Sequence, residues 1–180
     1  IFQLQSLQQF GGVSATPLDW TMVPYVRKSF YKHYIDGLHY IESVKANTEI
    51  KLALNKKEAQ NFSIEDQKVY NHSMAYTYAM DMTIKEVHQA VEGLYHNLNT
   101  LQSRSGNQLP FTSINYGTCI LPEGRMVTKA LLEISLEGLG KLHKTSIFPC
   151  GIFQYKKGIN DKPGTPNYDL YQLALKSTAH

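Results

Sequence analysis

The two cysteines are the most reactive side chains of the chain, and their surroundings differ. Cys119 follows a predicted strand and lies close to a predicted helix start at Pro122. A thiol near a helix N-terminus has a lowered pKa, so Cys119 is either a thiolate-forming group or a buried, inert thiol. Cys150 lies in the apolar stretch 147–151, which predicts a buried, inert thiol. No histidine stands near the cysteines at the spacing that a zinc site requires, so no zinc site is expected.

The seven histidines form no metal-binding pattern. None belongs to an H-x-x-x-H or H-E-x-x-H motif. His88 and His96 lie eight positions apart on one predicted helix, too far apart to share a metal ion. We therefore expect the histidines to be partly exposed helix residues and expect no metal site.

Phosphate-binding motifs with several glycines are absent, and so is the G-x-S-x-G elbow of hydrolases. Two turns between a predicted strand and a predicted helix remain, at residues 115–125 and 156–167. Such turns lie at the ligand-binding end of parallel sheets, and helix N-termini beside Arg or Lys favour anions. Each turn is either an anion site or an ordinary capped loop. The pair Gly11 and Gly12 is either a simple turn or a place of close backbone approach.

The first hundred residues are predicted to be mainly helical. The weakly alternating stretch 4–14 predicts an extended segment or strand that ends in a turn. A helix then begins with Asp19 as its N-cap and has apolar residues at spacings of three and four up to Ile41. The capping pattern of residues 63–66 predicts a long helix from there to about Thr100. Such a helix can cross a domain or pack against a second subunit, and 45–62 is expected to connect the two helices.

The second half predicts a strand–helix–strand–helix order. Residues 111–117 alternate like a strand, Pro122 begins a helix that stops at Gly138, 145–155 form a mostly buried strand, and the last helix starts near Asn167. This order favours parallel strands with crossover helices, and therefore an α/β fold.

Composition limits the class of protein further. The chain has 180 residues, of which 42% are hydrophobic and 18% charged, which excludes a disordered chain, a collagen and a coiled coil. No apolar run is long enough to span a membrane. The net charge of +3 is too small to suggest nucleic acid as a partner. Two cysteines fit a reducing compartment, here the cytoplasm. Both ends of the chain predict an excerpt from a longer protein.

One long segment resembles a known family. Residues 103–118 resemble the S-R-x-G-x-Q-x-P-F segment of anaerobic (class III) ribonucleoside-triphosphate reductases. The similarity continues through residues 122–125, 138–141, 145–149, 157–160, 163–170 and 173–175, and upstream through residues 8–14 and 23–26. It covers essentially the whole chain and is weakest at 45–75.

The resemblance implies an internal piece of a glycyl-radical enzyme whose catalytic domain is a ten-stranded α/β barrel. The complete enzyme converts ribonucleoside triphosphates into deoxyribonucleoside triphosphates for DNA synthesis without oxygen. A radical-SAM activase installs the glycyl radical, which generates a thiyl radical on a cysteine at the barrel centre. Formate or a thiol is the reductant, and deoxynucleotides and ATP are allosteric effectors.

The family's chemical groups are expected to lie outside this chain. The thiyl cysteine, the glycyl radical and the zinc cluster follow His180, and an ATP cone, where present, precedes Ile1. Where some members carry a second active-site cysteine, residues 4–7 contain none. The resemblance therefore implies no catalytic residue, bound cofactor or metal here, and an inactive fragment. We assign neither Cys119 nor Cys150 to radical chemistry.

The resemblance also implies roles for residues of this chain within one partial catalytic domain, 1–180. Residues 1–100 would form a dimer and effector region, and 101–180 a barrel segment. The expected substrate contacts are Gly11, Gly12, Ser113, Asn115, Gly117 and Thr118. The expected effector-phosphate contacts are Arg27, Lys28 and Lys32, which from spacing alone are either solvated charges or anion ligands. A homodimer is expected.

Two alternatives remain from the sequence. The chain is either a non-catalytic module that binds nucleotide or phosphate, or a part of another glycyl-radical enzyme acting on a small acid.

Overall fold

The computed structural model describes residues 2–8, 11–43, 63–66, 71–101 and 109–179. Its helices are α1 (Phe2–Gln8), α2 (Leu18–Tyr40), α4 (Ser73–Thr100), α5 (Pro122–Glu137) and α6 (Tyr168–Ala179). Its strands are β1 (Val13–Ala15), β2 (Thr112–Tyr116) and β3 (Cys150–Phe153). The predicted α/β class is thereby confirmed, and the connection predicted over 45–62 lies outside the described residues.

The three strands form one parallel sheet in the order β1-β2-β3. Ser14 pairs with Ser113, and Ser113 pairs with Cys150 on its other side. Because successive side chains of a strand point to opposite faces, this register places each trio of paired residues on one face of the sheet. β1 comes from the first hundred residues, so both halves of the chain contribute to the sheet.

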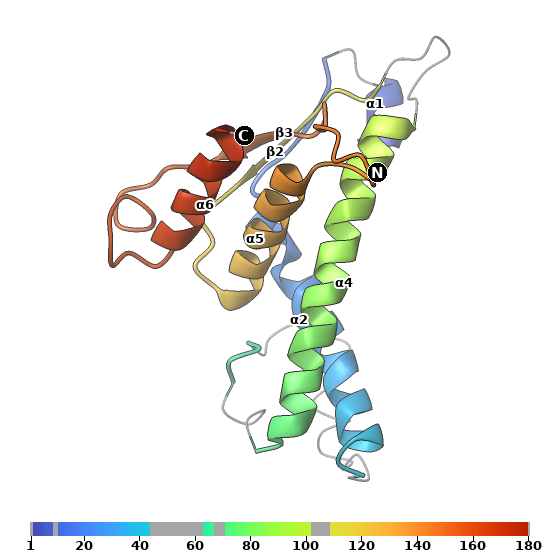
Figure 1. The fold of residues 1–180 in the computed structure, drawn as a ribbon, viewed down its shortest axis with the longest axis vertical. Helices are drawn as coiled ribbons and strands as arrows, with labels where there is room; N and C mark the ends of the chain where they lie inside the picture. Colours follow the sequence, from blue (N-terminus) through green and yellow to red (C-terminus); the bar gives the residue numbers. More distant parts are fainter. Residues whose placement is uncertain (1, 9–10, 44–62, 67–70, 102–108, 180) are drawn as a thin grey trace.

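One face of the sheet is covered by helices. Along β2, Thr112, Ile114 and Tyr116 are buried, whereas Ser113 and Asn115 are only half-buried. Ile114 and Tyr116 belong to a core that draws its other buried members from α2, α4, α5 and α6. Every one of these helices therefore packs on the same face of the sheet, and Figure 1 shows α5 lying between α4 and α6 beside the strands.

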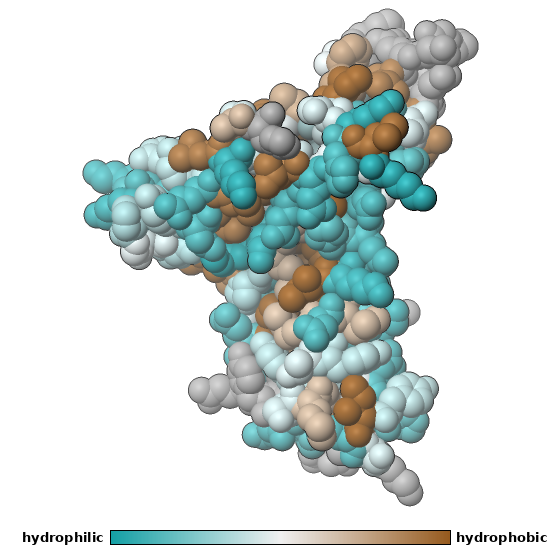
Figure 2. Space-filling model, viewed as in Figure 1, coloured by the Kyte–Doolittle hydropathy of each residue, from teal (hydrophilic) through white to brown (hydrophobic). Residues whose placement is uncertain are grey.

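The helices α2 and α4 lie side by side and extend away from the sheet (Figure 1). We call this pair the helical arm. Its interior contains a second core around Phe30, Leu38 and Ala79. Gly37 lets the helices approach closely, because a Cβ there would lie 3.0 Å from the Cα of Ala75. Figure 2 shows hydrophobic side chains gathered mainly near the sheet, with a mixed, mostly hydrophilic surface on the arm.

Four predicted elements differ from the structure. The mostly buried strand predicted over 145–155 is β3 alone, and it is largely exposed because no described strand lies on its outer side. The predicted extended segment over 4–14 instead contains α1, the glycine pair and then β1. The N-cap of α2 is Pro17. Asp19 lies inside the first turn, and its carboxylate accepts backbone amides of the turn after β2. Residues 63–66 form a turn, and α4 begins only at Ser73. The capping pattern was misleading because Ser63 bonds the amide of Glu65 within that turn.

None of the described helices is long and apolar enough to cross a membrane.

Candidate functional site

The face of the sheet opposite the helices carries a row of polar side chains. Ser14, Ser113 and Cys150 share this face across the three strands. Asn115 and Ile152 form the next pair along the strands, and Ile152 is 46% exposed. We call this surface the open face. Its residues have the correct chemistry for contacts with a polar ligand, because hydroxyl and amide groups both donate and accept hydrogen bonds.

A shallow hollow lies on the open face at the N-terminal ends of the strands. It is lined by Gly11, Gly12, Ser14, Ser113, Phe148 and Cys150, among others. Gly12 has a φ of +96°, and a Cβ there would lie 2.8 Å from the carbonyl oxygen of Phe111. The close approach that the glycine pair permits is thus an approach of the chain's own backbone. A Cβ at Gly11 would meet no described atom within 4 Å.

Asn115 offers one polar atom without a partner. Its Nδ2 donates to the hydroxyl of Thr16, which follows β1. Its Oδ1 is buried and accepts no hydrogen bond from any of the described residues. An unpaired buried carbonyl oxygen is costly, so Oδ1 of Asn115 is an unsatisfied acceptor among the described groups of the open face.

The turn after β2 is held by a buried carboxylate. Asp19 has no exposed surface, and its Oδ2 accepts the backbone N–H groups of Gly117 (2.9 Å), Thr118 (3.0 Å) and Cys119 (2.9 Å). Consecutive N–H groups that converge in this way form an anion-binding nest. The nest is occupied by the chain's own carboxylate from α2, which favours the capped-loop reading of this turn.

The second predicted turn satisfies its N–H groups in the same internal manner. The amide of Lys156 donates to Oδ1 of Asn160, and that of Gly158 donates to Oδ1 of Asp161. Both distances are 2.8 Å. These two amides are thus already occupied by side chains of the chain itself, which favours the capped-loop reading for this turn.

The two cysteines differ from each other in exposure and reactivity. Cys119 is fully buried, and burial raises the pKa of its thiol to about 11. Cys119 packs directly against Gly124, because a Cβ at Gly124 would lie only 2.6 Å from the Cβ of Cys119. Of the two readings of Cys119, the inert thiol is confirmed. The prediction that Cys150 is buried was wrong, because β3 has no described neighbour on its outer side and Cys150 lies on the open face.

The three cations predicted to contact effectors lie together on α2 but have different environments. The Nε of Arg27 lies 2.8 Å from Oε1 of Glu123, whose carboxylate is fully buried at the start of α5. Lys28 and Lys32 are exposed. The charge of Lys32 contributes to lowering the pKa of Glu86 on α4, although the hydrogen bond from Ser29 is the larger cause.

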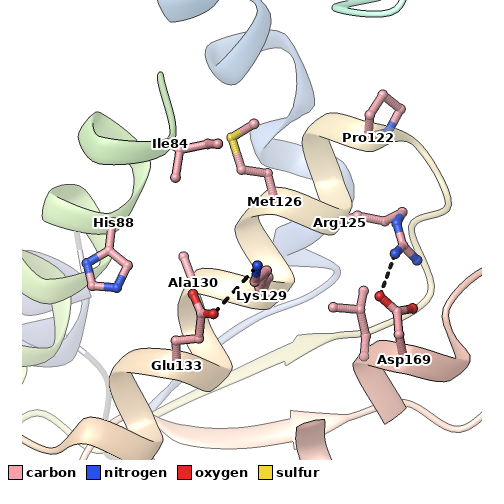
Figure 3. A pocket seen from close by; sticks show the side chains of 10 residues that line it. Ile84, His88, Pro122, Arg125, Met126, Lys129, Ala130, Glu133 and Asp169 are labelled. Carbon is pink, nitrogen blue, oxygen red and sulfur yellow. Dashed lines mark hydrogen bonds and ion pairs between the residues drawn. The ribbon is translucent and has the colours of Figure 1, made fainter. Parts of the chain in front are cut away.

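A further pocket lies between α4, α5 and α6 (Figure 3). Its polar lining is of mixed charge, and its cations are already paired. Arg125 bonds Asp169 at 2.7 Å and Oδ1 of Asn167 at 2.7 Å, and Lys129 lies 3.7 Å from Glu133. Both ion pairs are drawn in Figure 3. The pocket therefore offers less to an anionic ligand than its basic residues suggest.

Sequence reasoning missed the residues that hold the turn after β2. Asp19 was expected to cap its own helix, Asn167 only to begin the last helix, and Asn160 had no predicted role. No local signal identifies them, because Asp19 lies 98 to 100 positions from the amides that it binds. The substrate candidates divide into two groups: Gly11, Gly12 and Ser113 line the hollow, whereas Gly117 and Thr118 follow the carboxyl end of β2 beyond Asn115.

A small parallel sheet with helices on one face and polar side chains on the other defines an α/β protein. A comparison with known families identifies the family within this class. A family model described as anaerobic ribonucleoside-triphosphate reductase matches residues 1–180, and the chain belongs to that family.

Curated relatives agree with this assignment. The anaerobic ribonucleoside-triphosphate reductases of Escherichia coli and Haemophilus influenzae are each 32% identical to the chain over 167 residues, which is 93% of the chain. The protein of the same name from Enterobacteria phage T4 is 31% identical over 168 residues. The chain spans only 19% of the two bacterial proteins and 23% of the phage protein.

Proposed function

We propose that the chain is part of the catalytic barrel of an anaerobic ribonucleotide reductase, which reduces ribonucleoside triphosphates to deoxyribonucleoside triphosphates by glycyl and thiyl radical chemistry. Family membership supports the activity. The observation that carries the proposal is the open face, a polar sheet surface on which none of the described helices packs, opposite a surface covered by helices. The parent enzyme acts in the cytoplasm, and the fragment alone is inactive.

The strand order supports a barrel. Parallel strands that follow one another in sequence, with their crossover helices on one face, are the arrangement from which closed α/β barrels are built. An open doubly wound sheet would carry helices on both faces. The sheet ends at β1 and β3 within the described residues, so further strands of the parent protein would extend it to the ten-stranded barrel.

In this barrel the open face would line the interior and contact the nucleotide. Oδ1 of Asn115 would accept a hydrogen bond from a nucleotide hydroxyl, because it is the unpaired polar atom of this surface among the described residues. Ser113 and Thr118 would add hydroxyl groups, and Gly11, where a Cβ would meet no described atom within 4 Å, would leave room for the ligand. Gly12 and Gly117 would contact it through their backbone, because the space beside each is filled by Phe111 and Phe153. Enclosure also protects a radical from water-borne oxidants.

The remaining components are proposed for the parent enzyme. The thiyl cysteine, the glycyl radical, zinc, formate or a thiol reductant, and the radical-SAM activase act in parts beyond this chain. The helical arm would form a homodimer face that binds deoxynucleotide effectors. There the exposed Lys28 and Lys32 would contact effector phosphate, with Arg27 beside them.

The test is a substitution in the full-length enzyme, activated without oxygen and assayed for deoxynucleotide formation. Asn115→Ala removes the unpaired acceptor, and we expect turnover to fall roughly 10- to 100-fold, as for the loss of a contact to a reacting nucleotide. The control is Gln172→Ala on the exposed side of α6, for which we expect no change. Unchanged kinetics for Asn115→Ala would remove this residue from the site.

A further inference from the structure

The turn that carries Thr118 is held from both sides. Besides the three amides that Asp19 accepts, Nδ2 of Asn167 donates to the carbonyl oxygens of Gly117 (3.1 Å) and Cys119 (2.9 Å). Nδ2 of Asn160 donates to the same Gly117 oxygen at 3.1 Å. Asp19, Asn160 and Asn167 are all fully buried. Buried side chains therefore satisfy both the amides and the carbonyl oxygens of this turn, and these bonds fix its backbone conformation.

The residue next to Asp19 orients the side chain of the same turn. The Nε1 of Trp20 donates a hydrogen bond to Oγ1 of Thr118 at 3.3 Å. The backbone amide of Trp20 in turn donates to Oδ1 of Asp19 at 3.0 Å. The Asp19 carboxylate thus bonds both the backbone amide of Trp20 and the backbone of the turn that the indole of Trp20 contacts.

This arrangement makes the Thr118 oxygen an acceptor toward Trp20 and leaves its proton for another partner. A hydroxyl group has one proton to donate and can also accept. Since the indole N–H of Trp20 can only donate, the oxygen of Thr118 is the acceptor in their bond. The proton of Thr118 points elsewhere, and it meets no acceptor within the residues that the structure describes.

We propose that Asp19 and Trp20 are positioning residues that hold the Thr118 hydroxyl as a hydrogen-bond donor to an oxygen atom of the bound ribonucleotide. Asp19 fixes the backbone of the turn, and Trp20 fixes the orientation of the hydroxyl. This proposal rests on the proposed function, in which Thr118 contacts the nucleotide. It gives the first turn of α2 a role in substrate binding, although neither Asp19 nor Trp20 is expected to touch the reacting atoms.

The test uses the full-length enzyme with CTP as the probe. The variants are Trp20→Phe, which keeps the ring and removes the N–H donor, and Asp19→Asn. Binding of CTP is measured by calorimetry, and KM is measured separately for CTP and for the reductant. We expect Trp20→Phe to raise the Kd and KM of CTP roughly three- to tenfold, the usual effect of one hydrogen bond, with the KM of the reductant unchanged. Asp19→Asn should raise both CTP values by roughly tenfold or more, because the whole turn shifts.

A double-mutant cycle separates positioning from general structure. In a Thr118→Val background, Trp20→Phe should have no further effect on CTP binding, because its target hydroxyl is gone. Thr118→Ser should restore most of the affinity. The control is Tyr155→Phe, which removes a polar group from an exposed ring that lies against Tyr171 of α6, away from the helical arm, and should change nothing. Trp20 is 42% exposed, so its replacement tests the proposal even if Asp19→Asn fails to fold.

Two results would overturn the proposal. One is an unchanged CTP affinity in Trp20→Phe, and the other is an equal effect of Trp20→Phe with and without the Thr118 hydroxyl. Failure of the proposed function looks different: the wild-type enzyme would form no deoxynucleotide from CTP, whatever residue stands at position 20.

Discussion

The Nε of Arg27 lies 2.8 Å from Oε1 of Glu123, a carboxylate without exposed surface. The same oxygen accepts the backbone N–H of Ile64 at 3.0 Å. Glu123 therefore connects α2, the turn at 63–66 and α5. Removing one partner of a buried ion pair leaves an uncompensated charge, which costs more than the pair itself contributes.

Arg27→Met should destabilise the protein by about 3 kcal/mol, because the Glu123 carboxylate stays buried without this cation. Glu123→Gln should cost less, about 1–2 kcal/mol, since the amide oxygen still accepts from Ile64. Urea denaturation measures both free energies of unfolding. Lys28→Met, an exposed neighbour, serves as the control and should change stability by less than about 0.5 kcal/mol. An equal, small cost for Arg27→Met and Lys28→Met would contradict a stabilising role of this ion pair.

Gly124→Ala should severely destabilise the protein, by about 3 kcal/mol or more, because the new methyl group would overlap both the Sγ and the Cβ of Cys119. Cys119→Gly in the same chain should recover part of that loss. Thermal and urea unfolding of the single and double variants provide the comparison.

The matched control for this prediction is Gly93→Ala in the interior of α4, where a new Cβ meets nothing within 4 Å. Alanine is the better helix former, so this substitution should stabilise the protein by about 0.5–1 kcal/mol. A similar destabilisation by both alanines would show that space around Cys119 does not decide the effect.

Iodoacetamide should alkylate Cys150 and leave Cys119 unmodified. Cys150 is exposed, whereas burial raises the pKa of Cys119 to about 11. At about pH 8 only roughly one molecule in a thousand would carry a Cys119 thiolate, and that thiolate would still be inaccessible. Mass spectrometry of peptides from the 180-residue chain identifies the modified residue. Equal labelling of both cysteines in the folded chain would contradict this prediction.

The start of α4 should lose protection as the pH falls. The carboxylate of Glu42 accepts the amide of Ala75 at 3.0 Å and also bonds His72, and these bonds lower the pKa of Glu42 below 4.5, with the Ala75 bond as the largest cause. A lowered folded-state pKa means that the stabilisation is complete above the unfolded pKa. It is lost as the pH falls through the folded pKa.

Hydrogen exchange of peptides around Ala75, corrected for the intrinsic pH dependence, tests this effect. At about pH 7 the wild-type amides should exchange more slowly than those of Glu42→Gln, and the difference should shrink progressively as the pH falls below the ordinary carboxyl pKa. Glu92→Gln on the exposed side of α4 is the control. A difference that persists unchanged at acidic pH would mean that the charge of Glu42 is irrelevant to the helix start.

Local sequence patterns correctly predicted whether most elements are helices or strands. The apolar spacing predicted α2, and the end of the long helix at about Thr100 is confirmed. The order of elements in the second half is confirmed as well, because alternating strands and amphipathic helices leave a periodic pattern in the chain. The boundaries of elements were less predictable. Residues 63–66 match the capping-box pattern, but the Ser63 hydroxyl accepts the amide of Glu65 within a turn and does not cap a helix.

The sequence by itself determined the α/β class, the family and the helical content of the first half. These depend on residues a few positions apart, whose spacing follows from the geometry of helices and strands. Only the tertiary structure decided that Asp19 serves the turn after β2, that Arg27 pairs with Glu123, and that Cys150 lies on an open face. Those contacts join residues 96 to 100 positions apart or depend on which sheet face the helices cover. No local pattern encodes them, because they arise only when the chain has crossed back over the sheet.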